Sequence, residues 1–192
     1  MFRELWVSTV KFGFRLLYNE LAWTYDAVSW TVSLGHWRKW QTAALAYVQG
    51  EQVLEIAHGP GHMLVALHQK GYKTMGLDLS AAMGRQAADN LQQNDLTIKN
   101  DVPLIRSRVQ DLPFTDGSFD TVLSQFPTAF IAEQETLGAV YRVLKPNGRL
   151  VILPEGHLTG EGMVRQTIDW LFKVTGQRPD DLATQAEMGG QV

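Results

Sequence analysis

The stretch VLEIAHGPGH, residues 53–62, decides how this chain folds. Residues 52–56 are an apolar run with one acid, Glu55, which is typical of a buried parallel strand. Gly59 and Gly61 let the backbone turn sharply and approach a ligand closely, because glycine has no Cβ. A helix that begins next would point its free N–H groups at the charged part of that ligand. The stretch therefore predicts a nucleotide cradle, although glycine turns after strands also occur for purely structural reasons.

A second passage from strand to helix follows at residues 73–80, KTMGLDLS. Its strand ends in Asp78, and an acid at this point can accept hydrogen bonds from both hydroxyls of a ribose. The alternative is that Asp78 only caps the next helix, since aspartate and serine often begin helices. We expect Asp78 to converge with the glycine turn on one bound ligand.

From residue 52 onward, strand patterns alternate with helix patterns. This alternation predicts an α/β fold, a Rossmann-like parallel sheet with helices on both faces. The composition of residues 145–148, KPNG, predicts a turn. The expected strands are 52–57, 73–78, 103–109, 119–124 and 149–153, and the expected helices are 61–70, 80–94 and 132–144.

The bulk composition excludes several classes of function. The chain has 192 residues and a formal net charge of −3, which suits one α/β domain and gives no general attraction to nucleic acid. It has no cysteine, so thiolate chemistry and disulfides are excluded. No metal-ligand spacing joins its histidines, so no metal site is expected. No apolar run reaches the roughly 18 residues that span a bilayer.

Two further segments complete a recognisable pattern: LPFTDGSFD at residues 112–120 and RVLKPNGRLVI at residues 142–152. Together with the glycine turn and Asp78, and in this order, they resemble the motifs of class I S-adenosylmethionine-dependent methyltransferases. Residues 25–40 are similar to the segment before the first motif in ubiquinone and menaquinone C-methyltransferases and in bacterial phospholipid N-methyltransferases. The resemblance implies S-adenosylmethionine as methyl donor and S-adenosylhomocysteine as product. It also implies a small or lipid-like acceptor, either a quinol precursor or a phospholipid headgroup.

The same resemblance implies a role for each residue of a cofactor site. Glu55 would fix the amino end of the methionyl group, Asp78 would hold the ribose, and Tyr25 would close over the methionyl end. The other implied cofactor-binding residues lie along the turn (Ala57, His58, Gly59 and Gly61), beside the adenine (Leu79, Met83, Val109 and Gln110) and on the sulfonium side (Gln125 and Phe126).

Methyl transfer from a sulfonium is an in-line displacement, which mainly requires donor and acceptor to be aligned in a site that excludes water. Few catalytic side chains are therefore needed. The candidates are His58 and His62, which can accept a proton from a phenolic or amine acceptor, and Gln125 at the tip of the fourth strand. The alternative is that both histidines only line the turn.

Two residues depart from the family pattern. Ala57 stands where the first motif usually has its first glycine, and its methyl group is tolerable only at a negative φ. Arg108 stands where many relatives carry the acid that accepts from the adenine amino group, and arginine has no acceptor. These departures leave open a degenerate, non-catalytic cofactor-binding protein. A nicotinamide dehydrogenase is disfavoured, because the third and fourth motifs have no role there.

Residues 1–45 are expected to form a helical lid before a single methyltransferase domain at 46–192. Residues 1–24 are aromatic, amphipathic and locally basic, which favours peripheral membrane contact, with packing on the domain as the alternative. The resemblance and the missing export signal place the protein in the cytoplasm, at the inner membrane face. The residues after Pro154 leave little room for the family's C-terminal hairpin, so these strands are expected to be missing or truncated. A soluble metabolite stays an open alternative as acceptor, and the sequence predicts no oligomeric state.

Overall fold

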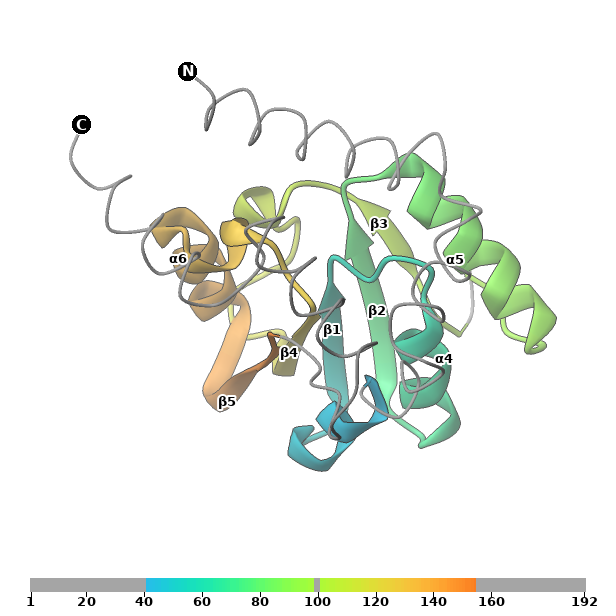
Figure 1. Cartoon of the computed structure of the whole chain (residues 1–192). Coiled ribbons are helices and arrows are strands. Elements are labelled where there is room, and N and C mark those ends of the chain that lie inside the picture. Colours follow the sequence, from blue (N-terminus) through green and yellow to red (C-terminus); the bar gives the residue numbers. More distant parts are fainter. Residues whose placement is uncertain (1–40, 99–100, 155–192) are drawn as a thin grey trace, which may run out of the picture.

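The computed structural model describes residues 41–98 and 101–154. The strands are β1 (Gln52–Ile56), β2 (Lys73–Asp78), β3 (Leu104–Arg106), β4 (Phe119–Gln125) and β5 (Leu144–Leu153). The helices are α4 (His62–Gln69), α5 (Ala81–Gln93) and α6 (Gln134–Val143), with the short 3-10 helices η2 (Ala44–Tyr47), η3 (Val109–Asp111) and η4 (Ala129–Ala132). All neighbouring strands are parallel, in the order β3-β2-β1-β4-β5. Figure 1 shows α6 on one side of this sheet and α4 and α5 on the other.

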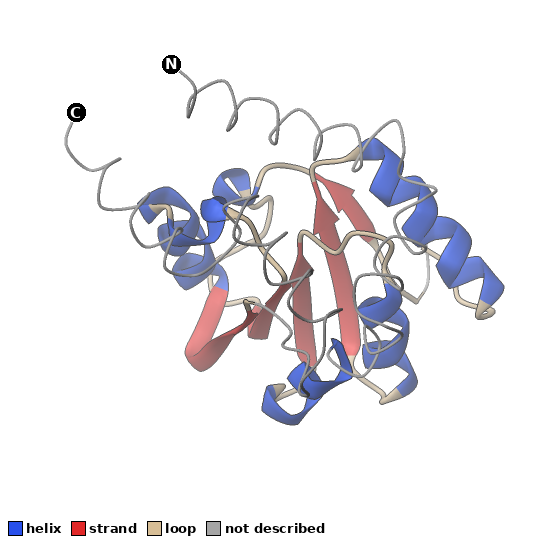
Figure 2. Ribbon diagram, in the orientation of Figure 1, coloured by secondary structure: helices blue, strands red, loops and turns tan. Residues whose placement is uncertain are grey.

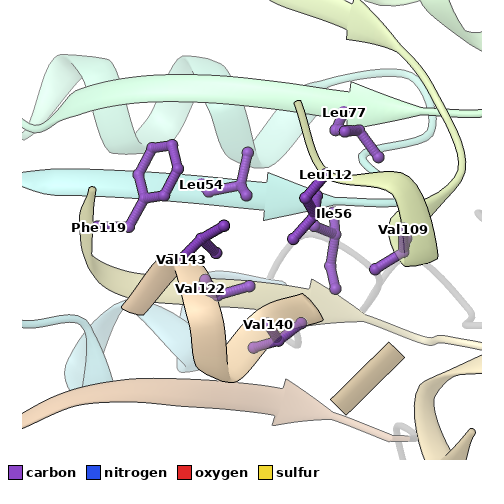
Figure 3. Packing of buried hydrophobic residues seen from close by; sticks show 9 residues of the cluster. All are labelled: Leu54, Ile56, Leu77, Val109, Leu112, Phe119, Val122, Val140 and Val143. Atoms are coloured by element: carbon purple, nitrogen blue, oxygen red, sulfur yellow. The ribbon is translucent and has the colours of Figure 1, made fainter. Parts of the chain in front are cut away.

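The sheet separates two apolar cores, because successive side chains of a strand point to opposite faces. Val53 of β1 packs with Met63 and Leu67 of α4. Leu54 and Ile56 point the other way, toward α6. The buried side chains of this second core are Leu54, Ile56, Leu77, Val109, Leu112, Phe119, Val122, Val140 and Val143 (Figure 3). The predicted parallel sheet with helices on both faces is therefore confirmed, and Figure 2 shows the strands between the helical layers.

The expected strand at 103–109 is too long. β3 ends at Arg106, and the chain then turns into η3. Val109 is apolar because it is buried in the second core, not because it pairs in the sheet. A short apolar run has the same composition in both settings, so the pattern alone does not distinguish them.

The last strand also begins earlier than expected. β5 starts at Leu144, and its pairing with β4 shifts register between Phe119 and Thr121. The predicted turn at 145–148 lies in this irregularity, where Asn147 has φ +64°. The turn residues are therefore accommodated as a bulge inside β5, which is how sheets absorb extra residues.

Asp120 joins the amino-terminal end of β1 to β4. Its Oδ2 accepts hydrogen bonds from the N–H groups of Glu51 at 3.0 Å and Gln52 at 2.9 Å, and Lys145 Nζ lies 2.9 Å away. The Gln52 N–H and the Lys145 ammonium lower the pKa of Asp120. Gly50 has φ +71°, and a Cβ there would overlap Asp120. This end of the sheet is thus closed by contacts within the chain, which leaves the carboxyl ends of the strands as the ligand edge.

Several expectations concern residues that lie outside the described ranges. The helical lid at 1–45 is described only from residue 41, and Tyr25, the membrane contact at 1–24 and the C-terminal hairpin are not described at all. They stay predictions. Among residues 41–98 and 101–154, no helix combines the length and the apolar character needed to cross a membrane.

Candidate functional site

The strand order reverses between β1 and β4, because β2 extends the sheet on one side of β1 and β4 on the other. In open parallel sheets, ligands bind at this reversal point, outside the carboxyl ends of the strands. Both chain segments that leave these two ends carry a non-glycine residue with a positive φ: Ala57 at +54° and Phe126 at +48°. Strained backbone of this kind clusters at ligand sites. The reversal point is therefore the candidate site.

Ala57 has a positive φ, +54°, so the condition that its methyl group is tolerable only at a negative φ does not hold in this turn. The Ala57 N–H donates to the carbonyl of Leu77 at 2.7 Å, and this bond directs the chain from the end of β1 toward β2. A left-handed φ costs an L-residue about 1 to 2 kcal/mol, and the turn keeps it at Ala57 while the next N–H, that of His58, also approaches the Leu77 carbonyl at 3.4 Å. Contacts across the sheet therefore overrule the local preference of alanine.

Ala57→Gly should raise the free energy of unfolding by about 0.5 to 1 kcal/mol, because relief of left-handed strain exceeds the added entropy of the unfolded chain. Urea denaturation measures this change. Ala88→Gly in α5 is the control, and it should lower the free energy of unfolding by about 1 kcal/mol. Equal destabilisation by both substitutions would show that the turn holds alanine without strain.

The two glycines of the turn, Gly59 and Gly61, have different structural roles. Gly61, with φ +79°, begins α4, and a Cβ there would lie 2.9 Å from the Cβ of Ala87 in α5. Gly59, with φ +54°, has no atom within 4 Å of the position of a Cβ. Gly61 therefore allows two helices to approach, whereas Gly59 presents an open, Cβ-free backbone at the ligand edge.

Asp78 is held firmly beside this open face. Its Oδ2 accepts from the N–H of Gly59 at 2.9 Å, and its Oδ1 accepts from the N–H of Ser80 at 2.8 Å. Ser80, not Asp78, caps α5, because the Oγ of Ser80 accepts a hydrogen bond from the N–H of Met83 at 3.2 Å. A carboxylate accepts about four hydrogen bonds, so Asp78 keeps acceptor capacity for two hydroxyls of a ligand.

Glu55 is a buried carboxyl group that lacks a donor. Its side chain is 2% exposed, and Oε2 has no hydrogen-bond partner among the residues that the structure describes. Burial, and then the negative charge of Asp78, raise the pKa of Glu55 well above its usual range. A buried unpartnered carboxylate is costly, so this position favours a ligand that brings a cationic donor.

Gln125, the last residue of β4, is also buried and half satisfied. Its Nε2 donates to the carbonyl of Gln41 at 2.8 Å, across 84 positions of sequence. Its Oε1 has no partner within the described part of the chain. No local feature of the sequence signals the contact with Gln41, because only the fold brings these two residues together.

Both candidate histidines support the turn. The Nδ1 of His58 lies 2.7 Å from the carbonyl oxygen of Gly59, and burial lowers the pKa of His58 although Asp78 opposes this change. The Nδ1 of His62 lies 2.7 Å from Nδ2 of Asn90, which also donates to the carbonyl of Pro60 at 3.2 Å. These contacts fit the alternative that the histidines line the turn, and a catalytic role for either stays a prediction.

The residues expected beside the adenine differ in exposure. Leu79 is 59% exposed at the rim, next to Asp78. Met83 and Val109 are buried, so their side chains already pack within the protein. Leu79 is therefore the one of these three whose side chain is free to contact a ligand ring.

Polar contacts shape the same rim. The Nε of Arg106 donates to the carbonyl of Leu79 at 3.0 Å, a contact that sequence reasoning missed. Gln110 Nε2 donates to Oε2 of Glu133 at 2.5 Å, so its amide is directed at the end of η4. Arg108 is exposed and precedes η3. None of the described residues form a cluster of three or more side chains that could hold a metal ion.

The sequence of this fold matches a known protein family. Residues 54–152 match the methyltransferase domain family, and this match covers more than half of the chain. The chain belongs to that family. The matched region runs from β1 through the glycine turn and Asp78 to β5, so the family assignment includes the whole candidate site.

Several curated relatives are named as methyltransferases of quinone biosynthesis. The demethylmenaquinone methyltransferase of Lactiplantibacillus plantarum is 32% identical over 163 residues, which cover 81% of this chain and 68% of the relative. The ubiquinone/menaquinone biosynthesis C-methyltransferase of Methylococcus capsulatus is 31% identical over 188 residues, which cover 87% of this chain and 74% of the relative. The chain spans only 55% of the length of the demethylmenaquinone methyltransferase of Clavibacter sepedonicus, to which it is 34% identical over 140 residues, or 71% of this chain.

Solved structures show the same fold at low identity. The geranyl diphosphate C-methyltransferase from Streptomyces coelicolor has a TM-score of 0.55 at 19% identity, with 60% of this chain and 44% of that chain covered. A SAM-dependent methyltransferase from Aquifex aeolicus has a TM-score of 0.53 at 19% identity, with 71% and 78% covered. The resemblance to class I S-adenosylmethionine-dependent methyltransferases close to the ubiquinone and menaquinone enzymes is thereby confirmed.

Proposed function

We propose that the protein transfers the methyl group of S-adenosylmethionine to a carbon atom of a quinone precursor and releases S-adenosylhomocysteine. One observation carries this proposal: at the reversal point, the open face of Gly59 lies beside the positioned carboxylate of Asp78 and the unpartnered carboxyl group of Glu55. An adenosyl amino acid brings a ribose diol and an ammonium group. These groups match the two carboxyl groups that the chain presents.

S-adenosylmethionine supplies an electrophilic methyl group when it is bound. Asp78 would accept from its ribose hydroxyls, Glu55 would pair with its ammonium group, and the Cβ-free Gly59 would let the backbone lie close to it. These contacts align the methyl group for in-line attack by the acceptor carbon. Transfer would form a bond between the acceptor carbon and the methyl group and break the C–S bond with its electron pair going to sulfur. The proton that the ring carbon then loses would pass to solvent water.

Support for the acceptor comes from the relatives. Besides the demethylmenaquinone enzymes, the 2-phytyl-1,4-beta-naphthoquinone methyltransferase of Arabidopsis thaliana is 31% identical over 146 residues, which cover 72% of this chain and 56% of the relative. The reduced, quinol form of a naphthoquinone with an apolar chain is therefore the first acceptor to test, because only the quinol ring is electron-rich enough to attack the methyl group. Binding of such an acceptor at the inner face of a membrane, with residues 1–24 in contact with the lipid, is part of the proposal.

Gly59→Ala tests the cofactor site directly. The added Cβ would project into the open face, so the affinity for S-adenosylhomocysteine should fall at least about tenfold by steric exclusion. Isothermal titration calorimetry measures this loss. Gly117→Ala is a matched control, because Gly117 has φ +63° and an equally open Cβ position in a turn between Asp116 and Ser118. Equal affinities of the two variants would contradict the proposed cradle.

The acceptor is tested by following a tritiated methyl group from S-adenosylmethionine into extracted product. Reduced demethylmenaquinone should become labelled on carbon, whereas phosphatidylethanolamine vesicles and a water-soluble catechol should not. Label in the lipid or the catechol would select the phospholipid or the soluble-metabolite alternative. Cofactor binding without any transfer would select the non-catalytic alternative that Ala57 and Arg108 raise.

A further inference from the structure

β5 forms one edge of the described sheet, next to α6 (Figure 1). Among the described strands, only β4 pairs with it. The N–H of Phe126, just after β4, donates to the carbonyl of Leu153 at 2.7 Å, so the polar groups of Leu153 face β4. Successive residues of a strand present their N–H and C=O groups to opposite edges. Leu150 and Ile152 therefore direct theirs outward, where they form a template for another strand.

The other edge of the sheet carries protection that β5 lacks. β3 is only three residues long and ends in the exposed Arg106. Short length and charge are two of the features that prevent edge-to-edge pairing in natural proteins. The first half of β5 contains Pro146 and the irregular register, but residues 150–153, LVIL, contain neither a charge nor a proline. The carboxyl half of β5 is therefore an unprotected edge.

Residues 150–153 also have the composition of a central strand, because both of their faces are apolar. Leu150 packs on the core beside α6, and Val151 packs on the core beside α4. None of the four residues is buried, and Ile152 is 39% exposed. A run of this kind is typical of a strand with neighbours on both sides, which indicates that the edge is covered by a further strand.

Most of the large apolar side chains exposed in the described part of the chain gather around this edge. Both α6 and η2 contact β5. Ala139, on one flank of α6, packs in the core that includes η3. Two positions along a helix correspond to about 200°, so Leu137 and Tyr141 lie on the opposite flank, which faces the outer side of β5. The exposed large apolar residues of these three elements are Tyr47, Leu137, Tyr141 and Ile152, and such clusters mark interfaces.

The charges around the edge are compatible with a second copy of the same edge. The basic side chains of α6 and β5 are each bound within their own copy. Arg142 pairs with Asp116, Lys145 pairs with Asp120, and Arg149 donates to the carbonyl of Tyr47. Two copies can therefore meet here without a row of unpaired like charges, the feature that normally keeps edges apart.

The sequence beyond β5 predicts no strand that would cover the edge from the same chain. Residues 164–174 have a helical pattern, and residues 176–192 are polar, with Pro179, Gly189 and Gly190 and no alternation of apolar residues. An apolar strand that is exposed on this protein and complementary to β5 is β5 itself.

We propose that the carboxyl half of β5 pairs antiparallel with β5 of a second copy, which joins two sheets across a two-fold axis at Val151. Leu150 then pairs with Ile152 of the second copy, and Ile152 with its Leu150, so the outward N–H and C=O groups of both residues form hydrogen bonds. The axis is perpendicular to the sheet, so each face continues into the same face of the second copy. Leu137 and Tyr141 therefore meet the α6 flank of that copy.

Sedimentation equilibrium of the full chain measures the assembly. Wild-type protein should have twice the 21.5 kDa mass of one chain at micromolar concentration. Ile152→Lys introduces a charge on each side of the axis and should raise the dissociation constant of the dimer at least about tenfold, because lysine on an edge strand opposes pairing. Ile98→Lys is the matched control: Ile98 is 40% exposed and lies outside the cluster around β5, so this variant should stay dimeric.

An introduced thiol tests the register, because the chain has no cysteine of its own. In the proposed pairing, Val151 faces Val151 of the second copy in a non-hydrogen-bonded pair, with Cα atoms about 4.5 Å apart. This separation is within the range of a disulfide, roughly 4.4 to 6.8 Å. Val151→Cys should therefore form a crosslinked dimer when oxygen and a copper catalyst oxidise the thiols. Ile105→Cys, in the middle of β3 on the protected edge, should not.

Several results would overturn the pairing. A monomeric wild-type protein would do so, and so would a dimer whose dissociation constant is unchanged in Ile152→Lys. If Ile152→Lys does not fold, the crosslink decides: no crosslink in Val151→Cys, or an equal one in Ile105→Cys, contradicts the proposed edge. The titration with S-adenosylhomocysteine is independent of these measurements, so a monomer leaves the proposed function standing and a failure to bind cofactor leaves the dimer standing.

Discussion

Glu55→Gln should make the cofactor-free protein more stable at pH 8 and make it bind S-adenosylhomocysteine at least about tenfold more weakly. The first effect follows from the raised pKa of Glu55, which burial and then Asp78 produce. The folded state binds the proton more tightly than the unfolded state. Stability that is fully present below the unfolded pKa is therefore lost as the pH rises toward the folded pKa. A glutamine stays neutral and avoids this loss, while the ammonium group loses its charged partner.

Urea denaturation between pH 4 and pH 8 measures the first effect. Glu55→Gln should leave the free energy of unfolding almost unchanged at pH 4. Toward pH 8 the substitution should raise it by up to about 1.4 kcal/mol for each unit by which the pKa of Glu55 is raised. Glu51→Gln is the control, because Glu51 pairs with Lys73 on the surface, where both side chains are mostly exposed. A gain that does not depend on pH would contradict a protonated, buried Glu55.

Gly61→Ala should lower the free energy of unfolding by about 2 to 4 kcal/mol, the sum of left-handed strain and overpacking. Gly61 has φ +79°, and the new Cβ would lie 2.9 Å from the Cβ and 3.2 Å from the Cα of Ala87. Part of this contact is with backbone, which has little freedom to move. Separation of α4 from α5 would also shift the turn that carries Gly59, so cofactor affinity should fall as well.

Two further substitutions separate the causes. Gly71→Ala also places alanine at a positive φ, +88°, but its Cβ would have no atom within 4 Å, so it should lose only about 1 to 2 kcal/mol. Ala87→Gly removes the atom that the new Cβ meets, and it should restore part of the stability in the Gly61→Ala background. Urea denaturation of the wild type, Gly61→Ala, Ala87→Gly and the double variant gives the coupling energy between positions 61 and 87. If Gly61→Ala loses no more than Gly71→Ala, the helices do not need this close approach.

The backbone at Ala57 bears on the non-catalytic alternative. The positive φ shows that the turn keeps the conformation that glycine favours, although alanine occupies it. The departure from the motif therefore affects stability more than the shape of the cradle. Asp78 and Gly59 are joined by a 2.9 Å hydrogen bond despite this strain. A cradle built in this way supports cofactor binding, and the labelled-methyl experiment decides whether transfer follows.

The sequence alone determined the elements whose signals are local. The apolar run that forms β1, the glycine turn and the strand tip at Asp78 were predictable, because strand composition and backbone freedom depend on nearby residues. Their order along the chain also indicated the parallel sheet. The ends of β3 and β5 were less predictable, since burial and strand pairing leave the same apolar pattern.

Only the tertiary structure decided how the site residues are satisfied. The left-handed φ of Ala57 occurs in a turn whose N–H groups at Ala57 and His58 both meet the carbonyl of Leu77 in β2. The different roles of Gly59 and Gly61 depend on where α5 lies. Among the described residues, whether the side-chain oxygens of Glu55 and Gln125 find a donor depends on where distant segments lie, as the contact of Gln125 with Gln41 across 84 positions shows. Local sequence patterns do not predict such distant partners, because these residues come together only in the folded sheet.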